Sequence, residues 1–168
     1  MSLRVDDSDG SVARLNHANG TVIVAAGKNG PEIFLYEANG SISVMVTGGE
    51  GGPMISLKNA NGTSSVRVTT GEHGPAIDLF DANGEPRLSL NVIQFDSRER
   101  GLITVPGLTM RDPNGTPSVE VRALEDGPSV GLFDAKKPDG NTSVEMRVDS
   151  KGPWLVSVKN GKVLWSAP

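Results

Sequence analysis

This 168-residue sequence has two histidines and no cysteine, and its side chains able to do acid–base or metal chemistry form no convergent set. His17 and His73 fall in predicted turns, and neither has a partner at the spacing of a metal site or a catalytic triad. Asp96 and Glu99 are close enough to act as an acid–base pair, but no nucleophile accompanies them. We therefore interpret these residues as solvated and predict that the chain is not an enzyme and needs no cofactor.

An acidic stretch near the start is a candidate calcium site. Asp6-Asp7-Ser8-Asp9-Gly10 clusters three carboxylates, and calcium takes six to eight oxygen ligands. The full pattern of a calcium-binding loop is missing, so a solvated acidic turn explains these residues better. The sequence has no cysteine, which excludes a disulfide framework and a thiolate metal site.

A β-turn that recurs seven times organises the rest of the chain. Asn-Gly or Asp-Gly pairs begin at Asn19, Asn39, Asn61, Asn83, Asn114, Asp139 and Asn160. Proline corners alternate with them, at Pro31, Pro53, Pro75, Pro106, Pro128 and Pro153. In the central copies the repeat is 22 residues long. An Asn-Gly pair between alternating apolar residues predicts a hairpin with a two-residue type I′ turn, in which both central residues have positive φ.

Apolar residues occupy two fixed series of positions around these turns. One series follows the prolines: Ile33 and Leu35, Ile55 and Leu57, Ile77 and Leu79, Leu108 and Met110, Val130 and Leu132. The other follows the asparagines: Val24 and Ala26, Val44 and Val46, Val66 and Val68, Leu88 and Leu90, Val119 and Val121, Val144 and Met146. The period of two predicts strands. Pairing across Asn39 would set Leu35 opposite Val44, and the next corner would set Val46 opposite Ile55, all on one face.

The predicted fold class is all-β, an antiparallel meander of about seven β-hairpin repeats, with a β-solenoid or a β-prism as alternatives. Residues 1–91 form regular repeats, 92–105 an insertion, and 106–168 further repeats with a terminal cap, in one continuous array. One hairpin buries too few apolar side chains to offset the entropy lost on ordering its 22 residues. The shared apolar face must therefore be covered.

The insertion Val92–Gly101 interrupts the pattern between Asn83 and Pro106. Insertions in repeat arrays often form binding loops on one face. This one equally fits a joint between a four-hairpin half and a three-hairpin half.

Near the C-terminus, the unit that begins at Pro153 is one residue short. This deletion should flip the strand, so that Trp154, Val156 and Val158 take the inner face. Trp154 and Trp165 are predicted to cap the end of the core, and an end-to-end contact is the alternative.

Three aromatic residues share one position in the repeat, five residues after the proline. Tyr36, Phe80 and Phe133 fall on the face opposite the apolar series. They could stack on sugar rings or bury against another subunit, and local packing over the turn is the simpler interpretation. With Trp154 and Trp165 they are the candidate ligand or subunit contacts.

Composition excludes several other classes of function. The net charge of −4 with interspersed signs argues against nucleic-acid binding. No run approaches the ~18 apolar residues of a membrane span, and no signal segment begins the chain. An extracellular surface or a virion is the favoured location. Asn-X-Ser/Thr sequons begin at Asn19, Asn39, Asn61, Asn114 and Asn141. Turn chemistry explains four of them, so glycosylation is not implied.

The Gly-Pro-X-apolar-X-apolar repeat, followed by a turn and a second apolar-X-apolar segment, resembles the repeats of viral and phage fibre shafts. That resemblance implies a trimeric triple β-spiral, although the period here is longer. Residues 155–166 look like a strand pair of the bulb-type β-prism lectins. The sugar motif of those lectins is missing here, so no binding residues are carried over.

The expected function is structural or adhesive. A fibre, spike or surface-assembly component would act by self-association. Cover by identical chains is favoured over curling of the chain on itself, because fourteen strands would enclose too wide a barrel for Val and Leu to fill, while folding back into layers would also bury the apolar face. The resemblance to fibre shafts implies that the favoured homo-oligomer is a trimer. The alternative is a carbohydrate-binding module that uses the repeated aromatic residues.

Overall fold

The computed structural model describes residues 2–6, 11–27, 30–49, 51–71, 74–97, 101–125, 127–134, 142–160 and 162–167, and all fifteen regular elements in these ranges are β-strands. The chain forms two compact units, Met1–Gly84 and Glu85–Pro168. Within each unit every strand pairs antiparallel with the next one along the chain. The predicted all-β meander of hairpin repeats is therefore confirmed, and the solenoid alternative, whose stacked coils pair strands in parallel, is wrong.

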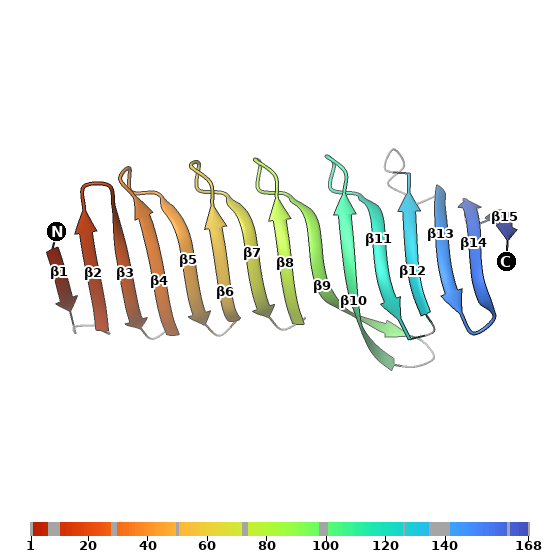
Figure 1. Cartoon of the computed structure of the whole chain (residues 1–168), viewed down its shortest axis with the longest axis horizontal. Helices are drawn as coiled ribbons and strands as arrows, with labels where there is room; N and C mark the ends of the chain where they lie inside the picture. The colour runs from red at the N-terminus through yellow and green to blue at the C-terminus, as the bar shows by residue number, and fades with distance from the viewer. Residues whose placement is uncertain are drawn as a thin grey trace. The chain divides into compact units, whose positions relative to one another are not determined.

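Eight strands make up the first unit, and they run alternately up and down in Figure 1. They are β1 (Ser2–Asp6), β2 (Ser11–His17), β3 (Gly20–Gly27), β4 (Gly30–Glu37), β5 (Ile42–Gly49), β6 (Gly52–Lys58), β7 (Ser64–Gly71) and β8 (Gly74–Phe80). The first of them is the half unit that precedes the regular repeats.

Seven strands make up the second unit. They are β9 (Pro86–Ser97), β10 (Gly101–Arg111), β11 (Pro117–Leu124), β12 (Gly127–Phe133), β13 (Thr142–Asp149), β14 (Gly152–Lys159) and β15 (Lys162–Ala167). The inserted segment lies at the far ends of β9 and β10, which are 12 and 11 residues long. There Val92 pairs with Pro106 and Ser97 with Gly101, so the extra residues lengthen this hairpin in register (Figure 1).

Strand register in the first unit follows the alternation of apolar residues. Leu35 lies opposite Val44, Ile33 opposite Val46, and Val46 opposite Ile55, as the sequence predicts. Each apolar side chain therefore points to the same face of the sheet as its partners on both neighbouring strands.

The turns at Asn39, Asn61, Asn83 and Asn114 differ from the predicted type I′ form, whereas Asn160 has the positive φ that this form requires, at 52°, between the paired residues Lys159 and Lys162. The Gly40 N–H donates to the Glu37 carbonyl over 2.9 Å, and the Glu37 N–H donates to the Ser41 carbonyl over 2.8 Å. Only the glycine has positive φ, at 83°, and Asn39 does not. The register shifts between Leu35 and Tyr36. This geometry is a longer loop in which a bulge absorbs the extra residue, so the predicted register survives beyond it.

The first hairpin closes earlier than the sequence predicts. His17 pairs with Gly20, and Leu15 pairs with Val22. The tight turn is therefore centred one residue before the Asn-Gly pair, and Val22 and Val24 take the two positions expected for Val24 and Ala26.

The predicted flip of the last full strand is wrong. Leu155 lies opposite Met146, on the apolar face, whereas Trp154 lies opposite Arg147. Trp154, Val156 and Val158 therefore share the second face. The corner that precedes β14 sets the register of β14 against β13. The unit is shorter only after β14, in the turn between Lys159 and Lys162, where Asn160 adopts a φ of 52°.

Candidate functional site

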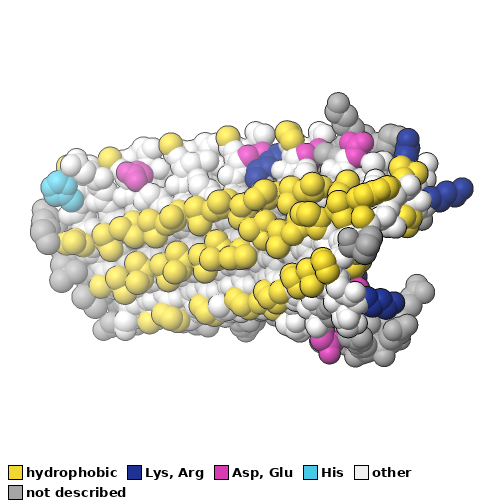
Figure 2. All heavy atoms as spheres, turned by 45° about the vertical axis from the view of Figure 1, so that its right-hand side comes forward, with side chains coloured by type: hydrophobic (Ala, Val, Ile, Leu, Met, Phe, Trp, Pro, Cys, Tyr) yellow, Lys and Arg dark blue, Asp and Glu magenta, His cyan; other side chains and the backbone are white. Residues whose placement is uncertain are grey.

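Two apolar rows cross the strands of the first unit, and we call the side of each sheet that carries such rows its apolar face. Paired residues make one row of Val24, Ile33, Val46, Ile55, Val68 and Ile77. A second row runs beside it through Val22, Leu35, Val44, Leu57, Val66 and Leu79. Figure 2 shows hydrophobic side chains gathered in rows of this kind. Ile55 remains 45% exposed and Ile77 40% exposed, so these side chains stay partly open to solvent.

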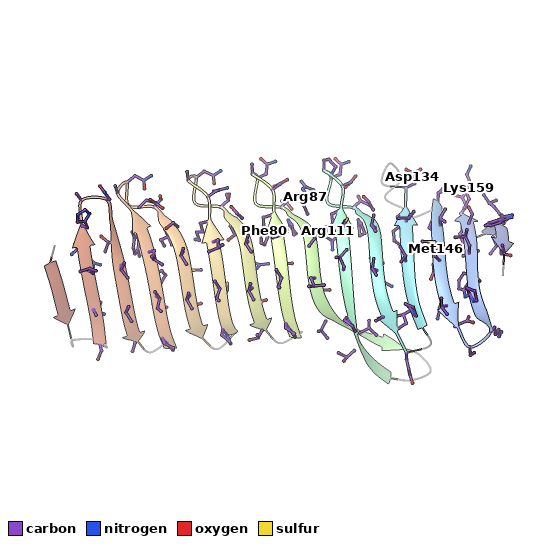
Figure 3. All side chains as sticks on the ribbon, viewed as in Figure 1. Phe80, Arg87, Arg111, Asp134, Met146 and Lys159 are labelled. Carbon is purple, nitrogen blue, oxygen red and sulfur yellow. The ribbon has the colours of Figure 1, made fainter. Side chains whose placement is uncertain are left out.

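The second unit carries the same two rows. One contains Leu90, Leu108, Val121, Val130, Met146 and Leu155, and the other contains Leu88, Met110, Val119, Leu132 and Val144. Met146, on β13 in Figure 3, is 49% exposed. Contiguous exposed apolar patches are a common feature of interaction surfaces, which makes this face a candidate one.

Smaller residues flank the apolar rows at the proline corners. Pro31 pairs with Ala26, Pro53 with Gly48, and Pro75 with Thr70. In the first unit, the valine, isoleucine and leucine side chains of this face therefore lie in the middle of the strands, in a strip about two residues wide. In the second unit Val148 lies opposite Pro153 at a corner.

The opposite, second face of the first unit holds two of the predicted aromatic contacts. The Tyr36 ring centroid lies 6.1 Å from that of Phe34. Phe80 lies at the turn end of β8 (Figure 3), with the Arg67 guanidinium 4.9 Å above its ring. Arg67 also forms an ion pair of 3.1 Å with Asp78. Both aromatic rings are half-buried against neighbours on their own sheet.

Phe133, the third predicted aromatic contact, packs differently. Gly131 is buried, and a Cβ placed on it would come within 2.8 Å of the Phe133 ring. The ring therefore occupies the space that a side chain at position 131 would fill. Beside it lies an open hollow of about 250 Å³ lined by Glu120, Arg122, Ser129, Ser143 and Glu145. Glu120 and Arg122 form an ion pair within this hollow.

Trp154 is held at the corner between β13 and β14. Its Nε1–H donates to Asp149 Oδ2 over 3.1 Å, and the Arg147 guanidinium lies 5.9 Å from its ring. The Lys151 N–H donates to Asp149 Oδ1 over 2.7 Å. This backbone hydrogen bond, helped by the indole and by Arg147, lowers the pKa of Asp149 below its ordinary value.

Trp165 lies on β15, opposite Ser157. That register places it on the apolar face, where it extends the second row beyond Val144. Its side chain is 52% exposed. Of the five predicted contacts, only Trp165 lies on the apolar face, and the other four lie on the second face.

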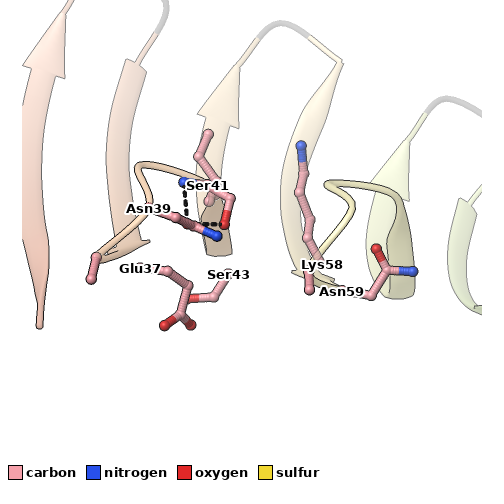
Figure 4. Close-up of a pocket in the computed structure, with 9 residues that line it drawn as sticks. Glu37, Asn39, Ser41, Ser43, Lys58 and Asn59 are labelled. Carbon is pink, nitrogen blue, oxygen red and sulfur yellow. Dashed lines mark hydrogen bonds between the residues drawn. The ribbon is translucent and has the colours of Figure 1, made fainter.

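The Asn-Gly turns form a third candidate surface along one end of the strands. An open hollow of about 370 Å³ lies between the turns that follow β4 and β6 (Figure 4). Asn39 Oδ1 accepts hydrogen bonds there from the Ser41 N–H and hydroxyl. Glu37 and Lys58 are the charged residues that line it. These groups can position a polar ligand, but they contain no nucleophile paired with a base.

Metal and acid–base chemistry find little support among the described side chains. No group of three or more His, Cys, Asp or Glu residues within them could hold a metal ion. His17 is exposed, and its Nδ1 accepts a hydrogen bond from the Asn19 N–H. His73, the acidic turn at residues 7–10, and the side chains of Asp96 and Glu99 lie outside the described set.

Comparison with known proteins found no protein-family model and no curated protein that matches the chain. Among the residues described, no helix is long and apolar enough to cross a membrane. Functional inference must therefore come from the surfaces themselves.

Sequence reasoning missed the contacts that hold the aromatic residues. Gly131 falls where the matching strands β4, β6 and β8 carry Phe34, Ser56 and Asp78. A glycine in mid-strand signals that something approaches the backbone closely. This exception to the repeat could have indicated that Phe133 lies over its own strand.

Proposed function

We propose that this protein is a non-enzymatic structural component that works by self-association through its apolar face. The observation that carries the proposal is the exposure of that face. Fourteen of its large apolar side chains, between Val24 and Val148 in the sequence, are 36–49% exposed. Burial of each Å² of this apolar surface would contribute about 25 cal/mol of stabilisation, which is lost while the surface stays in water. Rows of valine, isoleucine and leucine that cross many strands therefore favour a covering partner.

The two apolar rows of each unit offer a surface that a copy of the chain can cover. A second copy of this chain supplies a matching surface, because the same rows recur at the same spacing.

Strand length favours three copies. Strands of seven or eight residues are about 24–27 Å long. Three sheets of that width, set as the sides of a triangle, place each sheet about 7–8 Å from the central axis. Leucine and isoleucine in the middle rows would fill that space, while Gly48 and Pro53 would lie near a corner, where two sheets converge. A fibre, spike or surface-assembly component of the kind seen in viral fibre shafts suits this arrangement.

Val68→Asp tests the proposed contact surface. Val68 is in the middle of an apolar row and is 36% exposed. An aspartate there would be buried without a partner in the assembly, so we expect the variant to lose self-association. Light scattering coupled to size-exclusion chromatography measures the mass, and three chain masses are expected for the unmodified protein.

Thr69→Asp is the matched control. Thr69 is the next residue on the same strand and faces the opposite side, where it pairs with Ala76. It should leave the mass unchanged. A monomeric unmodified chain, or equal loss of mass in both variants, would contradict the proposal; a dimer would retain self-association and overturn the trimer.

A carbohydrate-binding role is the second candidate, and the hollow beside Phe133 favours it. An aromatic ring next to carboxylates and hydroxyls is a common way of holding a sugar ring. The three aromatic residues of the repeat differ in access, because Arg67 covers one side of Phe80. If the protein binds glycans here, Phe133→Ala should abolish binding on a glycan array and Phe80→Ala should not. Absence of binding by the unmodified protein would remove this candidate.

A further inference from the structure

The Asn-Gly turns look equivalent in the sequence but differ in how each asparagine is held. Four of them share one backbone geometry, with a glycine at positive φ whose N–H donates to the carbonyl three residues earlier: Gly40, Gly62, Gly84 and Gly115. The preceding residues, Asn39, Asn61, Asn83 and Asn114, are all exposed. Backbone geometry and exposure therefore do not distinguish the four sites.

In two of these asparagines, the residue two positions later holds the side-chain carboxamide through hydrogen bonds, and we call this arrangement a lock. Asn39 Oδ1 accepts from the Ser41 N–H at 2.9 Å and from the Ser41 hydroxyl at 2.6 Å. Asn61 Oδ1 accepts from the Thr63 N–H at 3.0 Å and from the Thr63 hydroxyl at 2.8 Å. In each case two donors fix the plane of the carboxamide.

The other two asparagines are held less firmly. At Asn114 only the amide nitrogen is held, by Asp112 Oδ2 at 3.2 Å, and the Thr116 N–H goes to Asp112 instead. At Asn83 the backbone N–H donates to Asp81 Oδ1 over 2.9 Å, but no hydrogen bond in the described structure holds its carboxamide. The residue two positions later is Glu85, which has no hydroxyl to donate.

We propose that Asn83 is a site of spontaneous covalent modification, at which the asparagine converts to aspartate and isoaspartate faster than at Asn39 or Asn61. The Gly84 nitrogen loses its proton and attacks Asn83 Cγ. A new C–N bond closes a five-membered succinimide, the Cγ–Nδ2 bond breaks, and the amide group leaves as ammonia. Water then opens the ring at either carbonyl. The net reaction consumes one water and releases one ammonia, with no change in oxidation state.

The locks slow this reaction because they oppose its first step. Attack requires the carboxamide to rotate until Cγ faces the glycine nitrogen. At both Asn39 and Asn61 that rotation breaks two hydrogen bonds, and at Asn61 it is also opposed by a third, from Nδ2 to the Ala82 carbonyl over 3.4 Å. For one or two bonds of ordinary net strength, the difference in rate from Asn83 is about five- to thirtyfold. Asn114, which has one such bond, should react at an intermediate rate.

The test is peptide mapping of the intact protein by mass spectrometry during incubation at mildly alkaline pH. The gain in mass that accompanies exchange of an amide for an acid is followed at each of the four sites. The same chain unfolded in urea supplies the reference, because all four asparagines precede glycine and should then react at similar rates. The expected result is that the peptide containing Asn83 reacts first in the folded chain only.

Two variants test these hydrogen bonds, one by adding a hydroxyl donor and one by removing it. Glu85→Thr installs at Asn83 the residue that locks Asn61, and it should slow reaction at Asn83 alone. Ser41→Ala removes a hydroxyl donor from Asn39 and should speed reaction there alone. The proposal is overturned if Asn83 reacts no faster than Asn39 in the folded chain, or if Glu85→Thr leaves its rate unchanged.

Discussion

At Gly84 the absence of a single Cβ allows the turn to form. Its φ of 84° lies in the left-handed region, which a β-branched residue occupies only with strain. A Cβ at this position would meet Thr63 at an ordinary contact distance of 3.8 Å, so crowding is not the obstacle. Gly84→Val should therefore destabilise the protein by about 1–3 kcal/mol through backbone strain alone.

Thermal unfolding followed by circular dichroism checks this value. Ala82→Val is the matched control, because Ala82 is exposed in the same turn and does not have positive φ. Equal melting temperatures for Gly84→Val and the unmodified protein would contradict the turn geometry.

Sequence patterns identified the turn glycines and the face of the three aromatic residues that recur in the repeat, but not the contacts of those residues. Tyr36, Phe80 and Phe133 occupy one repeat position, and all three lie on the predicted face. Their neighbours differ because the second face does not repeat: Phe34, Arg67 and Gly131 come from different sequence contexts. A repeat predicts what its copies share, and the site chemistry lies in what they do not share.

The contacts of Asp149 at the corner between β13 and β14 favour its ionised form. Hydrogen bonds from the Lys151 N–H and the Trp154 indole lower the pKa of this carboxyl. A carboxyl with a lower pKa in the folded than in the unfolded state stabilises the fold above its unfolded pKa. That contribution is lost as the pH falls through the lowered folded pKa. Stability should therefore decline in mild to strong acid.

Asp149→Asn is the variant that checks this effect. It keeps the shape of the side chain and removes its charge, so its loss of stability relative to the unmodified protein should be present at neutral pH and shrink below about pH 4. Unfolding measured across that range gives the result, and a difference that does not change with pH would argue against a role for the charge.

At the scale of the strand, alternation was the most informative pattern. It predicted that Ile33 faces Val46, and the bulge beside Tyr36 leaves that pairing intact. The turn type and the orientation of Trp154 were predicted incorrectly, because both depend on where one extra or missing residue is absorbed. The spacing of the motifs reveals that a residue is extra or missing, but it does not show whether the turn before the strand or the turn after it changes.

For the molecule as a whole, the two apolar rows follow directly from the period of 22 residues, whereas the proposed self-association does not. Alternation within one chain determines which side chains share a face. The proposal of three copies rests on strand length and on the small residues at the proline corners, such as Gly48. Those two features can be interpreted only once the strands are known to form an open meander.

The even length of the repeat has a consequence for how such a chain can change over evolutionary time. Each 22-residue copy consists of two antiparallel strands, so the next copy starts at the same end of the strands, runs in the same direction and presents its apolar residues to the same face. Loss or duplication of a whole copy by recombination would leave every later side chain on its original side. Single-residue insertions in mid-strand would reverse that assignment. The length of the protein can therefore change in steps of one hairpin while the apolar face keeps its rows.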